Sequence, residues 1–136
     1  MIPFKLEHID HVVLRAADVT RSLSFYCNVL GCTVDKIQPD IELTQLRAGA
    51  SQIDLVPVNA KRGDGAPNAP GRNVDHFALE IAPFDEAAIR AHLAAHGIDA
   101  GETKRRYGAR GYGPSLYLED PDGNVVELKG PPEAGG

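Results

Sequence analysis

The sequence contains an internal repeat, and this repeat limits the folds that the chain can adopt. Residues 74–79 read Val-Asp-His-Phe-Ala-Leu and residues 9–14 read Ile-Asp-His-Val-Val-Leu, so both copies place an Asp-His pair inside an apolar segment. A helical pattern follows each copy and stops at a glycine, Gly31 in the first half and Gly97 in the second. Short strand patterns come next in both halves. We therefore predict two copies of one structural unit.

The first half is predicted to contain one helix among four strands. Residues 6–16 alternate in the manner of a strand, with His11, Val13 and Arg15 on one face. Asp18 is a suitable N-cap for an amphipathic helix that ends at Gly31. Three further strand patterns cover residues 33–37, 42–46 and 52–58. The predicted order is therefore β-α-β-β-β.

The second half is predicted to repeat this order. Strand patterns cover residues 74–81, 103–110, 116–118 and 125–128. Residues 84–96 show helical periodicity. Residues 111–113, Gly-Tyr-Gly, read as a flexible bend, whereas Asp-Pro-Asp-Gly at 120–123 is a tight-turn signal that predicts a hairpin between the last two strands.

These patterns predict an α+β fold of two tandem βαβββ modules in one domain of 136 residues. Module one covers residues 6–58 and module two covers residues 73–130. Residues 59–72, rich in Gly, Pro and Asn, are predicted to be the linker, and residues 131–136 a tail. A linker of this length is either a flexible join or a cover over a site, and the sequence leaves both open.

The composition excludes some classes of partner. A net charge of −5 gives no electrostatic reason to bind nucleic acid, and no apolar run is long enough for a membrane span or a signal peptide. We therefore expect a cytoplasmic protein. Cys27 and Cys32 fit neither a zinc motif nor a disulfide framework, so we expect both thiols to be reduced.

Four polar residues occupy corresponding places in the two halves. His11 and His76 stand in the predicted first strands, and Asp54 and Glu127 interrupt apolar runs in the last strands. A carboxylate in such a run needs solvent, a partner or a metal, because desolvating an unpaired charge is costly. Two imidazoles and one or two carboxylates suit Zn, Ni, Co, Mn or Fe(II). If the halves pack face to face, the two histidines approach one another.

Together with the repeat, two segments carry a resemblance to a known superfamily: residues 14–31 and the ending at residues 119–127. The chain resembles the vicinal oxygen chelate (VOC) superfamily. That superfamily includes glyoxalase I, extradiol dioxygenases, fosfomycin-resistance transferases, methylmalonyl-CoA epimerase and bleomycin-binding proteins. The resemblance implies two βαβββ modules whose sheets curl around a shared metal cavity, a small-molecule substrate and a homodimer.

The resemblance also implies roles for the four polar residues. His11, His76 and Glu127 match three metal ligands of the superfamily, and Asp54 matches a fourth, glutamate ligand of glyoxalase I. Aspartate is one methylene shorter, so direct ligation, ligation through water and a role as the base all stay open for Asp54. In a glyoxalase-type isomerisation, Glu127 or Asp54 moves the proton between neighbouring carbons.

Three further residues are predicted to bind substrate. Arg15 matches a position that helps to hold the glutathione carboxylate in glyoxalase I, and Tyr117 matches a substrate-contacting tyrosine of fosfomycin enzymes and dioxygenases. Arg110 belongs to a basic cluster with residues 104–106. That cluster is either a solvated edge or the mouth of a cavity that favours an acidic substrate.

We expect a glyoxalase I-like lyase or isomerase. A dioxygenase would need another acid-base histidine late in the second half, and the chain has no histidine after His96. A fosfomycin transferase would need a threonine where Val13 stands. The alternative outside enzymes is a metal-free small-molecule binding or resistance protein, against which the retained polar residues argue.

Overall fold

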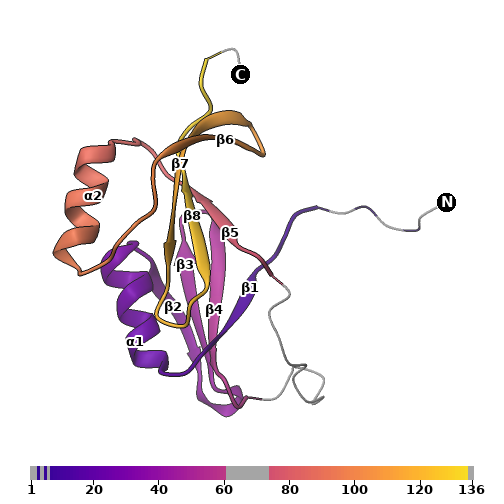
Figure 1. Ribbon diagram of the computed structural model, residues 1–136. Helices are drawn as coiled ribbons and strands as arrows, with labels where there is room; N and C mark the ends of the chain where they lie inside the picture. The colour runs from indigo at the N-terminus through magenta and orange to yellow at the C-terminus, as the bar shows by residue number, and fades with distance from the viewer. Residues whose placement is uncertain (1–2, 4, 6, 61–73, 135–136) are drawn as a thin grey trace. The chain divides into compact units, whose positions relative to one another are not determined.

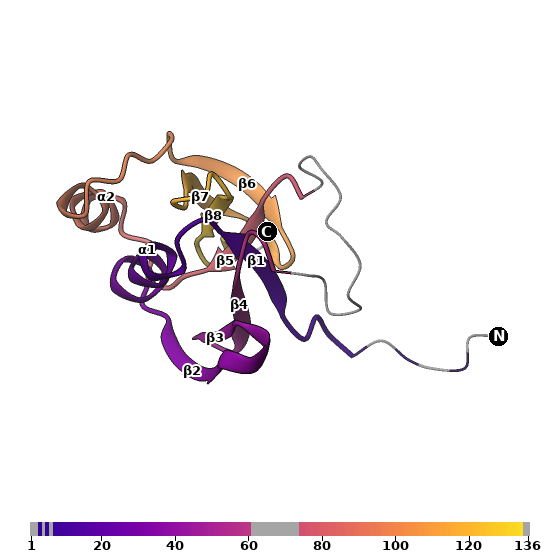
Figure 2. The ribbon, with the colours of Figure 1, turned by 90° about the horizontal axis from the view of Figure 1, so that it is seen from below.

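The structure, a computed structural model, describes residues 3, 5, 7–60 and 74–134. The chain divides into two compact units, Met1–Pro67 (unit 1) and Asn68–Gly136 (unit 2). Each unit contains one four-stranded mixed sheet and one α-helix, which lies on one side of the sheet of its own unit (Figures 1 and 2).

Unit 1 follows the predicted β-α-β-β-β order. Its elements are β1 (Val12–Ala16), α1 (Val19–Ser24), the π-helical turn η1 (Phe25–Val29), β2 (Thr33–Gln38), the 3-10 turn η2 (Pro39–Ile41), β3 (Leu43–Ala48) and β4 (Ser51–Pro57). The strand order in the sheet is β1-β4-β3-β2. β1 runs parallel to β4, and the other neighbours are antiparallel.

Unit 2 repeats this topology. Its elements are β5 (Phe77–Glu80), α2 (Glu86–Ala95), β6 (Lys104–Gly108), β7 (Gly111–Glu119) and β8 (Val125–Lys129). The strand order is β5-β8-β7-β6, with β5 parallel to β8 and the other pairs antiparallel. The predicted α+β fold of two tandem βαβββ modules is confirmed, and both sheets are open rather than closed.

The register of the two sheets places the predicted site residues equivalently. Asp54 of β4 lies opposite Val13 of β1, and Glu127 of β8 lies opposite Ala78 of β5. Val13 and Ala78 each follow their own histidine by two residues, so the histidine and the carboxylate share one face of the sheet in both units.

The sequence explains where the helices begin. The side chain of Asp18 accepts a hydrogen bond from the backbone N of Arg21 at 3.1 Å, and Asp85 does the same for Ala88 at 3.1 Å. These caps satisfy backbone donors that the first turn of a helix leaves unpaired. The N-cap predicted at Asp18 is therefore confirmed.

The core of each unit lies where apolar side chains of the sheet meet its helical segment. The buried apolar side chains of unit 1 include Tyr26, Leu46, Ile53 and Leu55, and those of unit 2 include Leu93, Leu116, Leu118, Val126 and Leu128. In the strands, these residues alternate with the polar positions of the opposite face. Burial of the apolar face therefore fixes the strand register, and this register determines which side chains lie on the opposite face of the sheet.

One prediction for the second half was wrong. Residues 111–113 are not a bend but the first residues of β7, where Gly113 pairs with Arg106 of β6. The side chain of Lys129 crosses the sheet at this point, and a Cβ on Gly113 would lie 2.9 Å from its Nζ and 2.5 Å from the backbone oxygen of Pro131. Glycine is required here for close approach, which the sequence pattern alone does not distinguish from turn-forming freedom.

Other differences concern boundaries. His11 and His76 lie one residue before β1 and β5 rather than within them. Residues 61–72 of the predicted linker lie outside the described residues. In the predicted tail, the backbone N of Glu133 donates to the oxygen of Tyr112 at 2.7 Å. Among the described residues, no helix is long and apolar enough to cross a membrane.

Candidate functional site

In unit 2 the structure brings His76 and Glu127 together. The distance from His76 Nε2 to Glu127 Oε1 is 3.2 Å, and the Glu127 side chain is only 8% exposed. Glu127 lies within β8, whose central position holds it away from solvent, whereas His76 reaches it from the segment that leads into β5. A buried carboxylate therefore faces an imidazole that remains 32% exposed.

Unit 1 contains the equivalent pair in a looser form. His11 Nε2 lies 3.7 Å from Asp54 Oδ2, and the Asp54 side chain is 2% exposed. The other carboxylate oxygen, Oδ1, accepts a hydrogen bond from Gln52 Nε2 at 3.1 Å. Asp54 is therefore held by the Gln52 side chain and faces His11, and its shorter reach leaves it farther from its histidine than Glu127 is from His76.

The spacing of each pair can be compared with the geometry of a metal centre. Nitrogen and oxygen ligands about 2.0–2.2 Å from one ion, separated by angles of roughly 90–109°, lie about 2.8–3.6 Å apart. The His76–Glu127 distance falls inside this range, and the His11–Asp54 distance is slightly wider. Imidazole and carboxylate donors also suit the divalent metals predicted above. The residues of each unit therefore fit as two of an ion's ligands.

The described residues contain no group of three or more His, Cys, Asp and Glu side chains that could hold a metal ion. Each unit provides one histidine and one carboxylate. Both cysteines are free thiols, as expected, and burial raises the pKa of Cys32 to about 11, so this thiol stays protonated at neutral pH. Thiolate ligation by Cys32 is therefore unfavourable.

Both histidines also contact the aspartate that precedes them. His11 Nδ1 lies 2.7 Å from Asp10 Oδ2, and His76 Nδ1 lies 2.7 Å from Asp75 Oδ2. The hydrogen bond that His11 donates to Asp10 raises the pKa of His11, an effect that desolvation opposes and the charge of Asp54 supports.

Arg15 lies beside the His11–Asp54 pair. A hollow of about 820 Å³ on this face of unit 1 is lined by His11, Arg15 and Asp54, and by Val13, Ile41, Glu42, Leu43, Val56, Asn59 and Ala60. The Arg15 guanidinium donates from Nη1 to the backbone oxygen of Ala60 at 2.5 Å. The hollow therefore combines a mainly apolar wall with one fixed cation beside the proposed ligands.

Tyr117 lies beside the His76–Glu127 pair. Its ring packs edge to face against His76, with ring centroids 5.2 Å apart, and it lies opposite Glu127 in the register of β7 and β8. The Arg106 guanidinium covers the Tyr117 ring at 4.3 Å from its centroid and donates to Ser115 Oγ at 2.8 Å. The ring is thus held between Arg106 of β6 and His76, which precedes β5.

The basic cluster mostly forms ion pairs with carboxylates. Arg110 donates to both oxygens of Glu80, at 2.6 and 3.1 Å, and Arg105 binds Glu133 in the same way. Lys104 lies 3.9 Å from Glu102. Arg106 differs, because it contacts the Tyr117 ring and Ser115. Arg106 is therefore linked to the His76–Glu127 pair through the Tyr117 ring, which contacts both Arg106 and His76.

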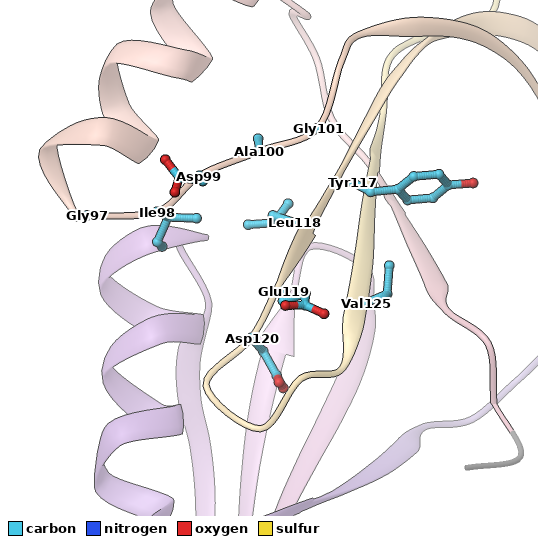
Figure 3. Close-up of a pocket in the computed structure, with 10 residues that line it drawn as sticks. All are labelled: Gly97, Ile98, Asp99, Ala100, Gly101, Tyr117, Leu118, Glu119, Asp120 and Val125. Carbon is cyan, nitrogen blue, oxygen red and sulfur yellow. The ribbon is translucent and has the colours of Figure 1, made fainter.

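A second hollow, of about 610 Å³, lies in unit 2 between residues 97–101 and the β7–β8 hairpin (Figure 3). Residues 97–101 form one wall, and Tyr117, Leu118, Glu119, Asp120 and Val125 contribute to the other. The Tyr117 ring points away from this hollow in Figure 3. His76 and Glu127 are not among the residues that line it.

Sequence reasoning missed four supporting residues. They are Asp10, Gln52, Asp75 and Ser115, which contact His11, Asp54, His76 and Arg106 respectively. The Asp-His pair was visible as part of the repeat, so a signal for Asp10 and Asp75 existed. Gln52 and Ser115 have no such signal, because their roles depend on strand register.

Comparisons with known proteins agree with this fold. The sequence profile of the Glyoxalase/Bleomycin resistance protein/Dioxygenase superfamily matches residues 8–128. A catechol-2,3-dioxygenase of Bacillus subtilis (strain 168) is 35% identical over 126 residues, which cover 89% of this chain. The chain spans only 40% of the length of that relative.

Two solved structures are similar over nearly their whole length. Virulence protein STM3117 from Salmonella typhimurium has a TM-score of 0.75 at 26% identity, with 93% of this chain and 98% of that chain covered. An integron cassette protein from V. cholerae, VCH_CASS1, also has a TM-score of 0.75, at 27% identity, with 95% and 98% covered.

Proposed function

Because the chain belongs to the Glyoxalase/Bleomycin resistance protein/Dioxygenase superfamily, we propose that it is a divalent-metal-dependent enzyme acting on a small molecule. The proposed reaction is of the glyoxalase I-like lyase or isomerase type, on a substrate that presents two neighbouring oxygens. The proposed metal ligands are His11, Asp54, His76 and Glu127. We further propose that the enzyme is a homodimer, for which light scattering should give twice the 14.6 kDa of one chain.

The observation that carries this proposal is the repeated pairing of an imidazole with a buried carboxylate. His76 and Glu127 form the tighter pair at 3.2 Å, and His11 and Asp54 form the looser pair at 3.7 Å. Each buried carboxylate faces an imidazole, and a bound cation would compensate its negative charge. The same arrangement in both units makes an incidental contact a poor explanation.

The chemistry assigned to the site follows from its donors. A bound divalent ion supplies a Lewis acid that stabilises negative charge on neighbouring substrate oxygens. Glu127 takes the proton from one substrate carbon and returns it to the adjacent carbon, so the reaction is a balanced isomerisation. Burial of Glu127 keeps bulk water away from that proton.

Three residues are proposed to bind the substrate: Arg15, Tyr117 and Arg110. Arg15 lines the hollow that holds His11 and Asp54, which supports a role in holding an anionic group. The Tyr117 ring contacts His76 directly. Arg110 already forms an ion pair with Glu80, so its role in binding substrate has the least support of the three. An Arg110→Glu variant with an unchanged KM for the true substrate would remove it from the site.

The first experiment measures metal content and binding. His92 and His96 stand four residues apart on one face at the end of α2, with rings 4.9 Å apart, an arrangement that can itself bind transition metals. A His96→Gln background removes this pair. Protein purified without chelator should retain about one ion per chain, and His11→Gln or His76→Gln should each abolish that binding.

Activity is tested with the hemithioacetal of methylglyoxal and glutathione, with thioester formation as the readout. Expected results are turnover by the metal-loaded protein and its loss in Glu127→Gln. If the protein retains no metal and gains no thermal stability from Zn, Ni, Co or Mn, the metal proposal fails, and a metal-free binding protein becomes the better interpretation.

A second candidate function is aerobic ring opening of a catechol. It is favoured by the 35% identity to the Bacillus subtilis catechol-2,3-dioxygenase. Against it, the second half has no histidine after His96 to move protons near the late strands. Oxygen uptake by the iron(II)-loaded protein in the presence of catechol would support this function over the isomerase.

A further inference from the structure

We propose that Asp10 and Asp75 are positioning residues, each of which fixes its neighbouring histidine so that the Nε2 atom faces a divalent metal. This inference rests on the proposed function, because it concerns the same ligands. The two aspartates were not among the site residues predicted from the sequence, and they do not touch the proposed ligand atoms themselves.

The geometry is the same in both units. Asp10 Oδ2 lies 2.7 Å from His11 Nδ1, and Asp75 Oδ2 lies 2.7 Å from His76 Nδ1. Both pairs occupy the segment immediately before the first strand of their unit. Neighbouring side chains inside a strand point to opposite faces, so this contact requires the irregular backbone that both segments have.

The direction of the hydrogen bond follows from the chemistry of its partners. An ionised carboxylate can only accept, so Nδ1 of each ring carries a proton in this contact. With Nδ1 held in this way, Nε2 is the nitrogen left to bind a metal, which would take the place of any proton on Nε2. In both units Nε2 is the atom that approaches the buried carboxylate, Asp54 in one and Glu127 in the other. The aspartates thus select the nitrogen that the metal needs.

The recurrence of the Asp-His contact in both units argues that it is not incidental. The two units differ around the carboxylates, since Gln52 of unit 1 corresponds to Val125 of unit 2 in the sequence before the carboxylate. The Asp-His contact nevertheless recurs with the same length. His92 and His96, by contrast, follow alanines, and their rings pack against one another. The Asp-His contact therefore accompanies the histidines of the proposed site.

Loss of such a partner typically weakens metal binding by about 10–100-fold. We therefore expect Asp10→Ala and Asp75→Ala each to raise the dissociation constant for Zn²⁺ and Ni²⁺ by about that factor. Asp10→Asn and Asp75→Asn retain an acceptor oxygen and should recover part of the affinity. Glu7→Ala is the matched control, because Glu7 also precedes a histidine, His8, that is not a proposed ligand.

Two readouts test the inference in the His96→Gln background. Nitrogen-15 NMR of the metal-free protein should show a protonated Nδ1 at His11 and His76 at pH 8, and its loss in the matching alanine variants. Competition with a chromogenic chelator gives the dissociation constants. Because both aspartate side chains are largely exposed, the metal-free variants should unfold at the temperature of the parent protein.

The outcomes separate this inference from the function on which it rests. An unprotonated Nδ1 in the parent protein overturns the inference, as do alanine variants that bind metal as tightly as Glu7→Ala. In both cases metal binding by the parent protein leaves the proposed function intact. A parent protein whose Nδ1 atoms are protonated but that binds neither ion overturns the proposed metal site, and with it the role of the aspartates toward a metal.

Discussion

Replacement of Glu127 by glutamine tests the proposed metal centre most directly. The substitution keeps the shape of the side chain but removes its charge and weakens it as a ligand. The Glu127 side chain is 8% exposed, so water has little access to replace the lost donor, and His76 Nε2 is 3.2 Å away. We therefore expect a large loss of metal affinity with little change in packing.

The expected size follows from linkage between binding and unfolding. At a free metal concentration 100 times the dissociation constant, binding stabilises the native parent protein by about 2.7 kcal/mol. If the substitution weakens binding by about 100-fold, the same concentration stabilises the variant by only about 0.4 kcal/mol. For a chain of this size, at roughly 4 °C per kcal/mol, the melting temperature rises by about 10 °C in the parent and about 2 °C in the variant.

The assay is thermal unfolding with and without Zn²⁺ or Ni²⁺, in the His96→Gln background. Glu119→Gln is the matched control, because Glu119 is an exposed residue of β7 whose loss changes the net charge equally. The control should keep the full shift. If Glu127→Gln keeps it as well, Glu127 is not a ligand, and the interpretation of the His76–Glu127 pair is wrong.

Three further predictions test the packing and electrostatics of unit 2. Leu116→Ala should cost about 2–5 kcal/mol in urea unfolding, since Leu116 is fully buried, whereas Val34→Ala at an exposed position should cost far less. Gly113→Ala should cost about 1–3 kcal/mol because its Cβ would meet Pro131 and Lys129, and Gly101→Ala, with ordinary contacts, is its control. The hydrogen bond from Arg110 lowers the pKa of Glu80 below its ordinary 4.5, so this pair stabilises the native state above pH 4.5 and the contribution disappears as the pH falls through the lowered pKa. Glu80→Gln should therefore flatten the dependence of stability on pH below 4.5, measured by urea unfolding; an unchanged slope contradicts this.

The fold could be predicted because local signals agreed with each other in both halves. The cap at Asp18 and the turn at Asp120 depend on residues close in sequence; Asp120 Oδ1 accepts from the backbone N of Asp122 and of Asn124, at 2.9 and 2.8 Å. The start of β7 could not be predicted in this way. Gly113 pairs with Arg106 of β6, and the Lys129 side chain, from a later strand, leaves no room for a Cβ at this position.

The candidate site could also be predicted only in part from the sequence. The residue types of His76 and Glu127, and their equivalence to His11 and Asp54, could be read from the repeat. Their distances could not, because the strand register sets how far each carboxylate stands from its histidine. The exposed Arg110 shows the limit most clearly: its sequence context left both a solvated edge and a cavity mouth open, and in the structure it pairs with the carboxylate of Glu80.

The difference between the two carboxylates bears on which of them moves the proton. Asp54 has one oxygen bound by the Gln52 amide and the other facing His11, so rotation of this short side chain would break a hydrogen bond in a buried setting. Glu127 has one more rotatable bond, and Val125 stands where Gln52 would correspond. A base that collects a proton from one carbon and delivers it to the next must change its orientation between the two. We therefore infer that, in the proposed isomerisation, Glu127 is the mobile base and Asp54 is a fixed ligand.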